Sequence, residues 1–158
     1  MKSLNFIKMH GLGNDFVIFN STEKKLHDPK FIKKISDRKT GIGCDLVVIT
    51  RNSDIEYCDI YAKFINSDGT TAEVCGNALR CLGKEFFKLK QKKHLVIETD
   101  KRLIDIEDYG NGNICVDMGK PKYDCNSIPL SSTNNNTISF NLEYLKIGYA
   151  LNVGNPHL

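Results

Sequence analysis

The sequence contains no tryptophan, only four prolines and no long apolar run. Residues 1–6 are followed by Lys8 and His10 without an apolar stretch, so we expect neither a signal peptide nor a membrane anchor. Lysines occur as pairs and not as long basic blocks, and the formal net charge is only +3, which argues against a nucleic-acid-binding surface. These absences predict a cytoplasmic protein with no nucleic-acid and no membrane partner.

The composition is typical of a globular protein. Hydrophobic residues make up 41% of the 158 residues and charged residues 26%, which excludes disordered and membrane-spanning classes. A chain of this length fits one ordinary domain, or slightly more than one, and can bury a substantial core.

The six cysteines show no CxxC spacing and no Cys/His cluster of the kind that binds zinc, so we expect no metal site. Nothing indicates secretion, so no disulfide framework is expected either. Cys58, Cys81 and Cys115 lie within apolar patterns and are predicted to be core residues. We therefore expect Cys75 to be alkylated faster than Cys58 or Cys115.

Cys75 differs from the others because of its position. It follows a turn at Asp68-Gly69 and precedes an apolar stretch, from about Gly76 to Leu89, that is typical of a helix. A thiol at the first turn of a helix faces unpaired N–H groups and the positive end of the helix dipole, which favour the reactive thiolate. The alternative is a small buried apolar residue, as most free cysteines are.

Short strand patterns dominate the rest of the chain. The first two form a hairpin around residues 11–14, and a first helix begins at Pro29 with Asp28 as its N-cap. The helix after Cys75 is apolar around most of its circumference, so it is predicted to be enclosed by the strands. The strands are expected at residues 4–9, 15–20, 46–50, 57–66, 94–99, 102–107 and 113–118. This pattern predicts an α+β fold, a β-barrel around a central helix.

The composition changes after Gly119. A polar loop at residues 131–136 is followed by strand patterns at 137–142 and 145–153. We therefore expect one domain at residues 1–119 and the beginning of a second at 120–158.

Five sequence motifs resemble those of a known protein family. They are MHGLGNDF at residues 9–16, GIGCD at 41–45, NSDG at 66–69, CGN at 75–77 with Arg80-Cys81, and GNPH at 154–157. In this order and spacing they resemble diaminopimelate epimerase, and the chain is similar to the N-terminal portion of that family, ending after the GNPH motif.

The resemblance implies a cofactor-independent isomerase that interconverts LL- and meso-2,6-diaminopimelate, a small-molecule substrate in lysine and peptidoglycan precursor biosynthesis. It implies two pseudo-symmetric domains, each a barrel around a helix and each supplying one cysteine as acid or base. Cys75 matches the first of these catalytic cysteines. No pyridoxal phosphate or other cofactor is expected, and a homodimer is a possible assembly.

The resemblance also assigns the remaining site residues. Gly76 and Asn77 match positions that hold the substrate α-carboxylate, and Asn14, Asn66 and Asn155 match other substrate-binding positions. His157 matches a residue that tunes the catalytic cysteines. Without the resemblance, the three asparagines outside the helix are better interpreted as turn residues, where asparagine is commonest.

The sequence departs from the family at three points. Leu46, or a one-residue deletion, stands where the family usually has a glutamine that contacts substrate, and Ala78-Leu79 replaces a smaller pair after the CGN motif. The second catalytic cysteine has no counterpart within the 158 residues. We therefore expect residues 1–158 alone to be inactive. A related proline-racemase-like isomerase and a non-catalytic fragment are the alternative functions.

Overall fold

The computed structural model describes residues 3–124, 126–129, 139–142 and 145–158. The chain divides into two compact units, Met1–Asp117 and Met118–Leu158. Interpretation of the second unit as the beginning of a pseudo-symmetric domain stays a prediction.

The first unit is built on a seven-stranded mixed sheet in which sequence neighbours are also spatial neighbours. Its strands are β1 (Ile7–Gly11), β2 (Asn14–Asn20), β3 (Leu46–Arg51), β4 (Ile60–Asn66), β5 (His94–Glu98), β6 (Leu103–Gly110) and β7 (Asn113–Val116). The β2–β3 and β4–β5 pairs are parallel and the other four are antiparallel.

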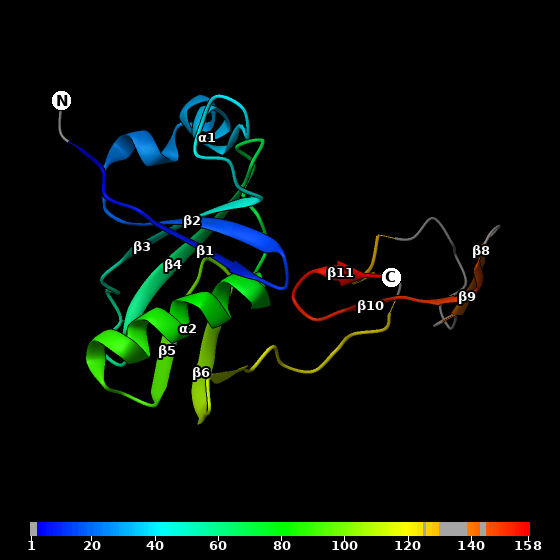
Figure 1. Ribbon diagram of the computed structural model, residues 1–158. Helices are drawn as coiled ribbons and strands as arrows, with labels where there is room; N and C mark the ends of the chain where they lie inside the picture. The colour runs from blue at the N-terminus through cyan, green and yellow to red at the C-terminus, as the bar shows by residue number, and fades with distance from the viewer. Residues whose placement is uncertain (1–2, 125, 130–138, 143–144) are drawn as a thin grey trace. The chain divides into compact units, whose positions relative to one another are not determined.

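Helix α2 (Gly76–Lys90) lies against one face of this sheet (Figure 1). It contacts β1 and β2 near one edge of the sheet and β5, β6 and β7 near the other, so the sheet curves around it as a half-barrel. The predicted α+β barrel-like fold around a central helix is therefore confirmed.

Close packing at Gly83 shows how tightly the helix is held. A Cβ at this position would lie 2.9 Å from Cγ2 of Ile106 and 3.1 Å from Cγ2 of Ile114. The last turn is less enclosed than the sequence predicts, because Leu89 is 67% exposed. The apolar positions buried on the helix are Ala78, Leu79, Cys81, Leu82 and Phe87.

The opposite face of the sheet packs against η1 (Lys24–His27) and α1 (Pro29–Ser36). Helix α1 begins as predicted, with Pro29 in its first turn and the Asp28 carboxylate accepting a hydrogen bond from the Lys30 N–H at 3.0 Å. Ile32 brings the apolar side of this helix onto Val17 and Val47 of the sheet.

Strand β7 corrects one prediction. Cys115 is exposed, whereas its neighbours Ile114 and Val116 are half-buried. Successive side chains of a strand point to opposite faces, so a cysteine between two inward-facing residues must face outward. The prediction of a core position for Cys115 is wrong, while Cys58 and Cys81 are buried as expected.

The described part of the second unit contains two short antiparallel strand pairs. Strand β8 (Ser139–Leu142) pairs with β9 (Leu145–Tyr149), and β10 (Leu151–Asn152) pairs with β11 (Pro156–His157). The polar loop predicted at residues 131–136 lies outside the described residues.

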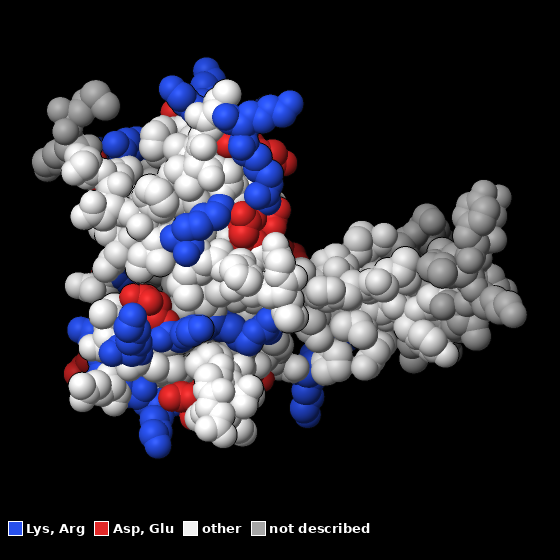
Figure 2. All heavy atoms as spheres, in the orientation of Figure 1, with Lys and Arg blue, Asp and Glu red and all other residues white. Residues whose placement is uncertain are grey.

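Basic and acidic side chains are interspersed on the face of the first unit that Figure 2 shows. Within the described parts of the chain, no helix combines the length and apolar character needed to cross a membrane.

Candidate active site

Cys75 is the N-cap residue of α2, with an extended backbone (φ −110°, ψ 108°) and a half-buried, free thiol. Its carbonyl accepts the first bond of the helix, from the Leu79 N–H at 3.0 Å, but its side chain makes no capping bond. The N–H groups of the first turn therefore remain available beside the sulfur.

The buried cysteines of the described chain have a different environment. Burial raises the pKa of the Cys44, Cys58 and Cys81 thiols, because an apolar surrounding disfavours the thiolate. They are suited to packing and not to acid–base chemistry.

The β1–β2 hairpin brings Asn14 to Cys75. Leu12 and Gly13 both have positive φ, 54° and 85°, as the two central residues of a tight type I′ turn. Asn14 begins β2 directly after this turn, and its Oδ1 lies 3.5 Å from Sγ of Cys75. Gly11 lies so close to the start of α2 that a Cβ there would come within 3.3 Å of the Asn77 carbonyl oxygen.

A network of charged side chains lies behind Asn14. Nδ2 of Asn14 donates to Oδ2 of Asp45 at 2.9 Å. Nη2 of Arg38 bridges Oδ1 of Asp15 at 2.7 Å and Oδ1 of Asp45 at 2.8 Å, and Nζ of Lys8 lies 2.8 Å from Asp15. The Arg38 guanidinium holds the pKa of Asp15 well below its usual range, with a further contribution from Lys8.

The first turn of α2, which directly follows Cys75, supplies hydrogen-bond donors. Nη2 of Arg80 donates to Oδ1 of Asn77, so the amide oxygen of Asn77 is occupied and its NH₂ group is the part left for a ligand. Gly76 has no side chain between its own N–H and the space beside Cys75. A carboxylate is the natural ligand for this group of donors.

Asn66 lies at the end of β4, as predicted, but its side chain is used within its own turn. Its Nδ2 donates to Oγ1 of Thr70 at 2.9 Å, and its N–H donates to the Thr70 carbonyl at 2.8 Å. The turn is adjacent to the network behind Asn14, because the Ser67 N–H donates to the Asp45 carbonyl at 3.2 Å.

Asn155 and His157 belong to the second unit. Nε2 of His157 lies 2.9 Å from Oδ1 of Asn155, and His157 is paired with Leu151. Their roles at the site stay predictions.

The structure shows the surroundings of two residues, Leu46 and Arg38, whose contacts the sequence alone does not predict. Leu46, the departure from the family, is buried as the first residue of β3 and can offer a ligand only apolar contact. Arg38 was missed, because no periodicity or motif marks it and its partner Asp15 is 23 residues away.

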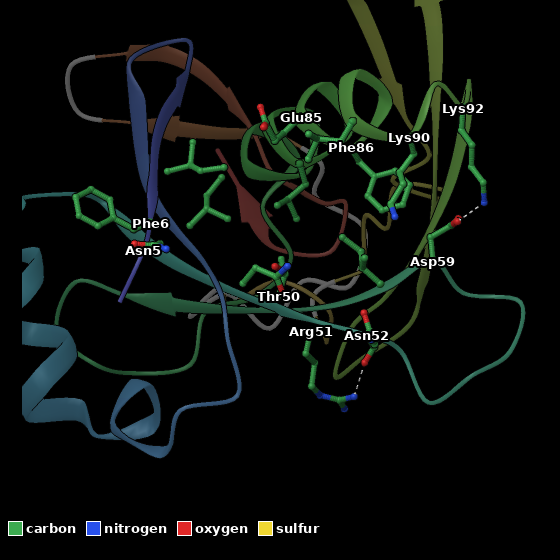
Figure 3. A pocket seen from close by; sticks show the side chains of 16 residues that line it. Asn5, Phe6, Thr50, Arg51, Asn52, Asp59, Glu85, Phe86, Lys90 and Lys92 are labelled. Atoms are coloured by element: carbon green, nitrogen blue, oxygen red, sulfur yellow. Dashed lines mark hydrogen bonds and ion pairs between the residues drawn. The ribbon is translucent and has the colours of Figure 1, made fainter. Parts of the chain in front are cut away.

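A separate cavity of about 580 Å³ lies beside the C-terminal half of α2 (Figure 3). Glu85, Phe86 and Lys90 of the helix and Thr50 of β3 are among the residues that line it. None of the predicted site residues lines it. Among the described residues, no group of three His, Cys, Asp or Glu side chains is arranged to hold a metal ion.

The motifs, the half-barrel and the position of Cys75 can now be compared with known proteins. A family model described as diaminopimelate epimerase matches residues 6–123. The chain belongs to the diaminopimelate epimerase family.

Curated relatives agree with this assignment. The chain is 39% identical over 158 residues to the diaminopimelate epimerase of Wolbachia sp. subsp. Drosophila simulans (strain wRi), a match that covers 99% of the chain and 58% of that protein. It is 39% identical over 165 residues to the diaminopimelate epimerase of Carboxydothermus hydrogenoformans, covering 98% of the chain and 58% of that protein. The chain thus spans little more than half the length of these relatives.

Solved structures share the fold at low sequence identity. A predicted epimerase from Pseudomonas aeruginosa superposes with a TM-score of 0.63 at 11% identity, covering 98% of this chain and 57% of that one. A hydroxyproline epimerase from Agrobacterium vitis superposes with a TM-score of 0.54 at 12% identity, covering 72% of this chain and 40% of that one.

Proposed function

We propose that this protein interconverts LL- and meso-2,6-diaminopimelate without a cofactor, and that Cys75 is one of its two acid–base groups. The observation that carries the proposal is the free thiol of Cys75 at the N-cap of an enclosed helix, in a chain of the diaminopimelate epimerase family. We further propose a cytoplasmic enzyme that acts on this small molecule, with no nucleic-acid or membrane partner, and that assembles as a homodimer.

The chemistry requires a strong proton acceptor in a site that stabilises negative charge. As a thiolate, Cys75 takes the α-proton of the substrate, and the electron pair of the broken C–H bond remains on the α-carbon and its carboxylate. The amide donors of Gly76 and Asn77 hold that carboxylate and stabilise the charge that develops on it. A second thiol on the opposite face then delivers a proton, which inverts the stereocentre.

The other predicted residues have supporting roles in this proposal. Asn14, Asn66 and Asn155 bind polar groups of the substrate, since neutral amides both donate and accept. His157 influences the protonation of the cysteines.

The decisive experiment replaces Cys75 by serine in the full chain as it is encoded. A serine hydroxyl is far too weak a base, so Cys75→Ser should lose all measurable LL-to-meso conversion and all exchange of the substrate α-hydrogen with deuterated solvent. The matched control is Cys115→Ser, because Cys115 is exposed on β7 and contributes to no part of the proposed site. Conversion by Cys75→Ser at the rate of the control would refute the proposal.

A related racemase is the second candidate, since the fold is shared with a hydroxyproline epimerase. Assay of the full encoded chain, with diaminopimelate, proline and hydroxyproline as substrates, separates the two. Turnover of proline, with none of diaminopimelate, would favour the second candidate, and absence of both would favour a non-catalytic fragment.

A further inference from the structure

Three residues from different parts of the chain form a hydrogen-bonded series that ends at the thiol. Oδ2 of Asp45 accepts from Nδ2 of Asn14 at 2.9 Å, and Oδ1 of Asn14 lies 3.5 Å from Sγ of Cys75. We propose that Asp45 is a positioning residue that turns the Asn14 amide so that its oxygen faces Cys75 and accepts a hydrogen bond from the thiol, which lowers the reactivity of Cys75 in the ligand-free protein. The proposal rests on the acid–base role proposed above for Cys75.

The orientation of the amide follows from what each partner can do. An ionised carboxylate only accepts hydrogen bonds, so Asp45 selects the NH₂ end of the Asn14 amide. The oxygen end must then face the sulfur. A thiol donates to that oxygen, whereas a thiolate, which only accepts, is repelled by it.

Asp45 is itself held in place from several directions. Its Oδ2 also accepts from the Asp15 N–H at 3.0 Å, and its Oδ1 accepts from Nη2 of Arg38 at 2.8 Å. In return, the Asp45 N–H donates to Oδ1 of Asp15 at 3.0 Å. Both oxygens of the carboxylate are engaged, so rotation of one partner side chain does not release it, and the orientation of Asn14 is correspondingly fixed.

Two opposing influences therefore act on one sulfur atom. The N-terminus of α2 favours the thiolate, and the Asn14 oxygen favours the thiol. Asn14 is hydrogen-bonded to both Asp45 and Cys75, so the proposed effect of Asp45 passes through the direction in which the Asn14 amide points.

The test measures iodoacetamide alkylation of Cys75 at pH 7 in the ligand-free protein, with each labelled cysteine quantified by peptide mass spectrometry. Asp45→Ala frees the amide to present its NH₂ group to the sulfur, and alkylation should be faster by about fivefold, the factor that an ordinary hydrogen bond supplies. Asp45→Asn removes the same negative charge but keeps an oxygen that accepts from Asn14. Its alkylation rate should therefore stay within about twofold of the unmodified protein.

Three other cysteines serve as internal references. Cys115 is exposed and should be labelled equally in all variants, whereas Cys58 and Cys81 are buried and should be labelled only if the variant unfolds. If Asp45→Ala does unfold, Asn14→Ala replaces it, and the thiolate is read by the ultraviolet absorbance that Cys75→Ser removes. This absorbance should be greater in Asn14→Ala than in the unmodified protein.

Equal alkylation rates in Asp45→Ala and Asp45→Asn would overturn the proposal, since charge alone would then explain the effect. An unchanged rate in Asp45→Ala, or an unchanged absorbance in Asn14→Ala, would overturn it as well. The experiment uses no substrate, so its outcome is independent of the conversion assay. Activity in Cys75→Ser would refute the proposed function and leave the labelling result standing.

Discussion

At the scale of single residues, Arg80 fixes the orientation of the Asn77 side chain by a hydrogen bond. Its guanidinium occupies Oδ1 of Asn77 and leaves the NH₂ group to face an anion, whereas Asp45 does the reverse to Asn14. The cationic Arg80 and the anionic Asp45 therefore orient the amides of Asn77 and Asn14 in opposite directions. The amide that donates lies on the helix proposed to hold the carboxylate, and the one that accepts lies beside the thiol.

Replacement of Arg80 by methionine should weaken substrate binding. The Asn77 amide would lose the bond that fixes it, and we expect KM for diaminopimelate to increase about five- to tenfold in the full chain, as the loss of one oriented hydrogen bond predicts. Steady-state kinetics of conversion measure this change. Lys84→Met is the control, because Lys84 is an exposed cation one turn further along α2; equal KM values in both variants would contradict the prediction.

The carboxylate of Asp15 makes the stability of the folded protein depend on pH. Arg38 lowers its pKa in the folded protein below the value of about 3.9 expected in the unfolded chain. The stabilisation is therefore fully present above about pH 4 and is lost as the pH falls through the folded-state pKa. Arg38→Gln should return the pKa of Asp15 toward its usual range and shift acid unfolding to higher pH.

Urea unfolding between pH 7 and pH 2 measures this shift. Lys39→Gln is the matched control, because Lys39 is an exposed neighbouring cation whose backbone N–H, and not its side chain, bonds to Asp37. If the free energies of unfolding of Arg38→Gln and Lys39→Gln decreased equally between pH 7 and pH 3, the Asp15–Arg38 ion pair would not contribute to stability.

At the scale of elements, Gly83 sets how closely α2 approaches the sheet. Alanine is normally favoured over glycine within a helix by about 1 kcal/mol. Here a Cβ would lie 2.9 Å from Ile106 and 3.1 Å from Ile114, on β6 and β7. Overpacking of a core usually costs about 1–3 kcal/mol, so the steric cost should exceed the gain in helix propensity.

We therefore expect Gly83→Ala to lower the free energy of unfolding by about 1 kcal/mol or more. Thermal and urea denaturation provide the measurement. Lys84→Ala, at the next and exposed position, should change stability by less than about 0.5 kcal/mol. A stabilised Gly83→Ala protein would mean that β6 and β7 adjust to the added methyl group at little cost.

At the scale of the whole molecule, the number of acid–base groups decides activity. A two-base epimerase needs an acid and a base on opposite faces of one carbon, each within about 3–3.5 Å of its reacting atom. Within residues 1–158, Cys75 is the cysteine placed at a described helix N-terminus, and Cys44, Cys58 and Cys81 are buried.

Purified residues 1–158 should accordingly show no measurable LL-to-meso conversion. A proton removed by Cys75 from one face can return only to that face, so any exchange of the α-hydrogen should retain configuration. Chiral analysis of diaminopimelate incubated in deuterated water provides the measurement, with Cys75→Ser as the blank. Exchange with inversion would contradict the prediction and would indicate that a second copy or a second fragment supplies the missing acid.

The local elements could be predicted from the sequence because their causes are local. Asp28 and Pro29 start α1 through a capping bond and a preset φ, both within three residues. The apolar periodicity after Cys75 predicts α2 and its burial, and hence the placement of the thiol at a helix N-terminus. The asparagines of the site could be identified only from the family motifs, because asparagine is also a common turn residue.

Only the tertiary structure decided what surrounds Cys75. Parallel pairing of β2 with β3 sets Phe16 opposite Leu46, and this register is what brings Asp15 beside Asp45 and both beside Arg38. The direction of the Asn14 amide follows from that contact across 31 residues. Strand pairing and register are long-range properties, so no short window of sequence contains them. For the same reason the outward face of Cys115 became evident only when β7 was placed against α2.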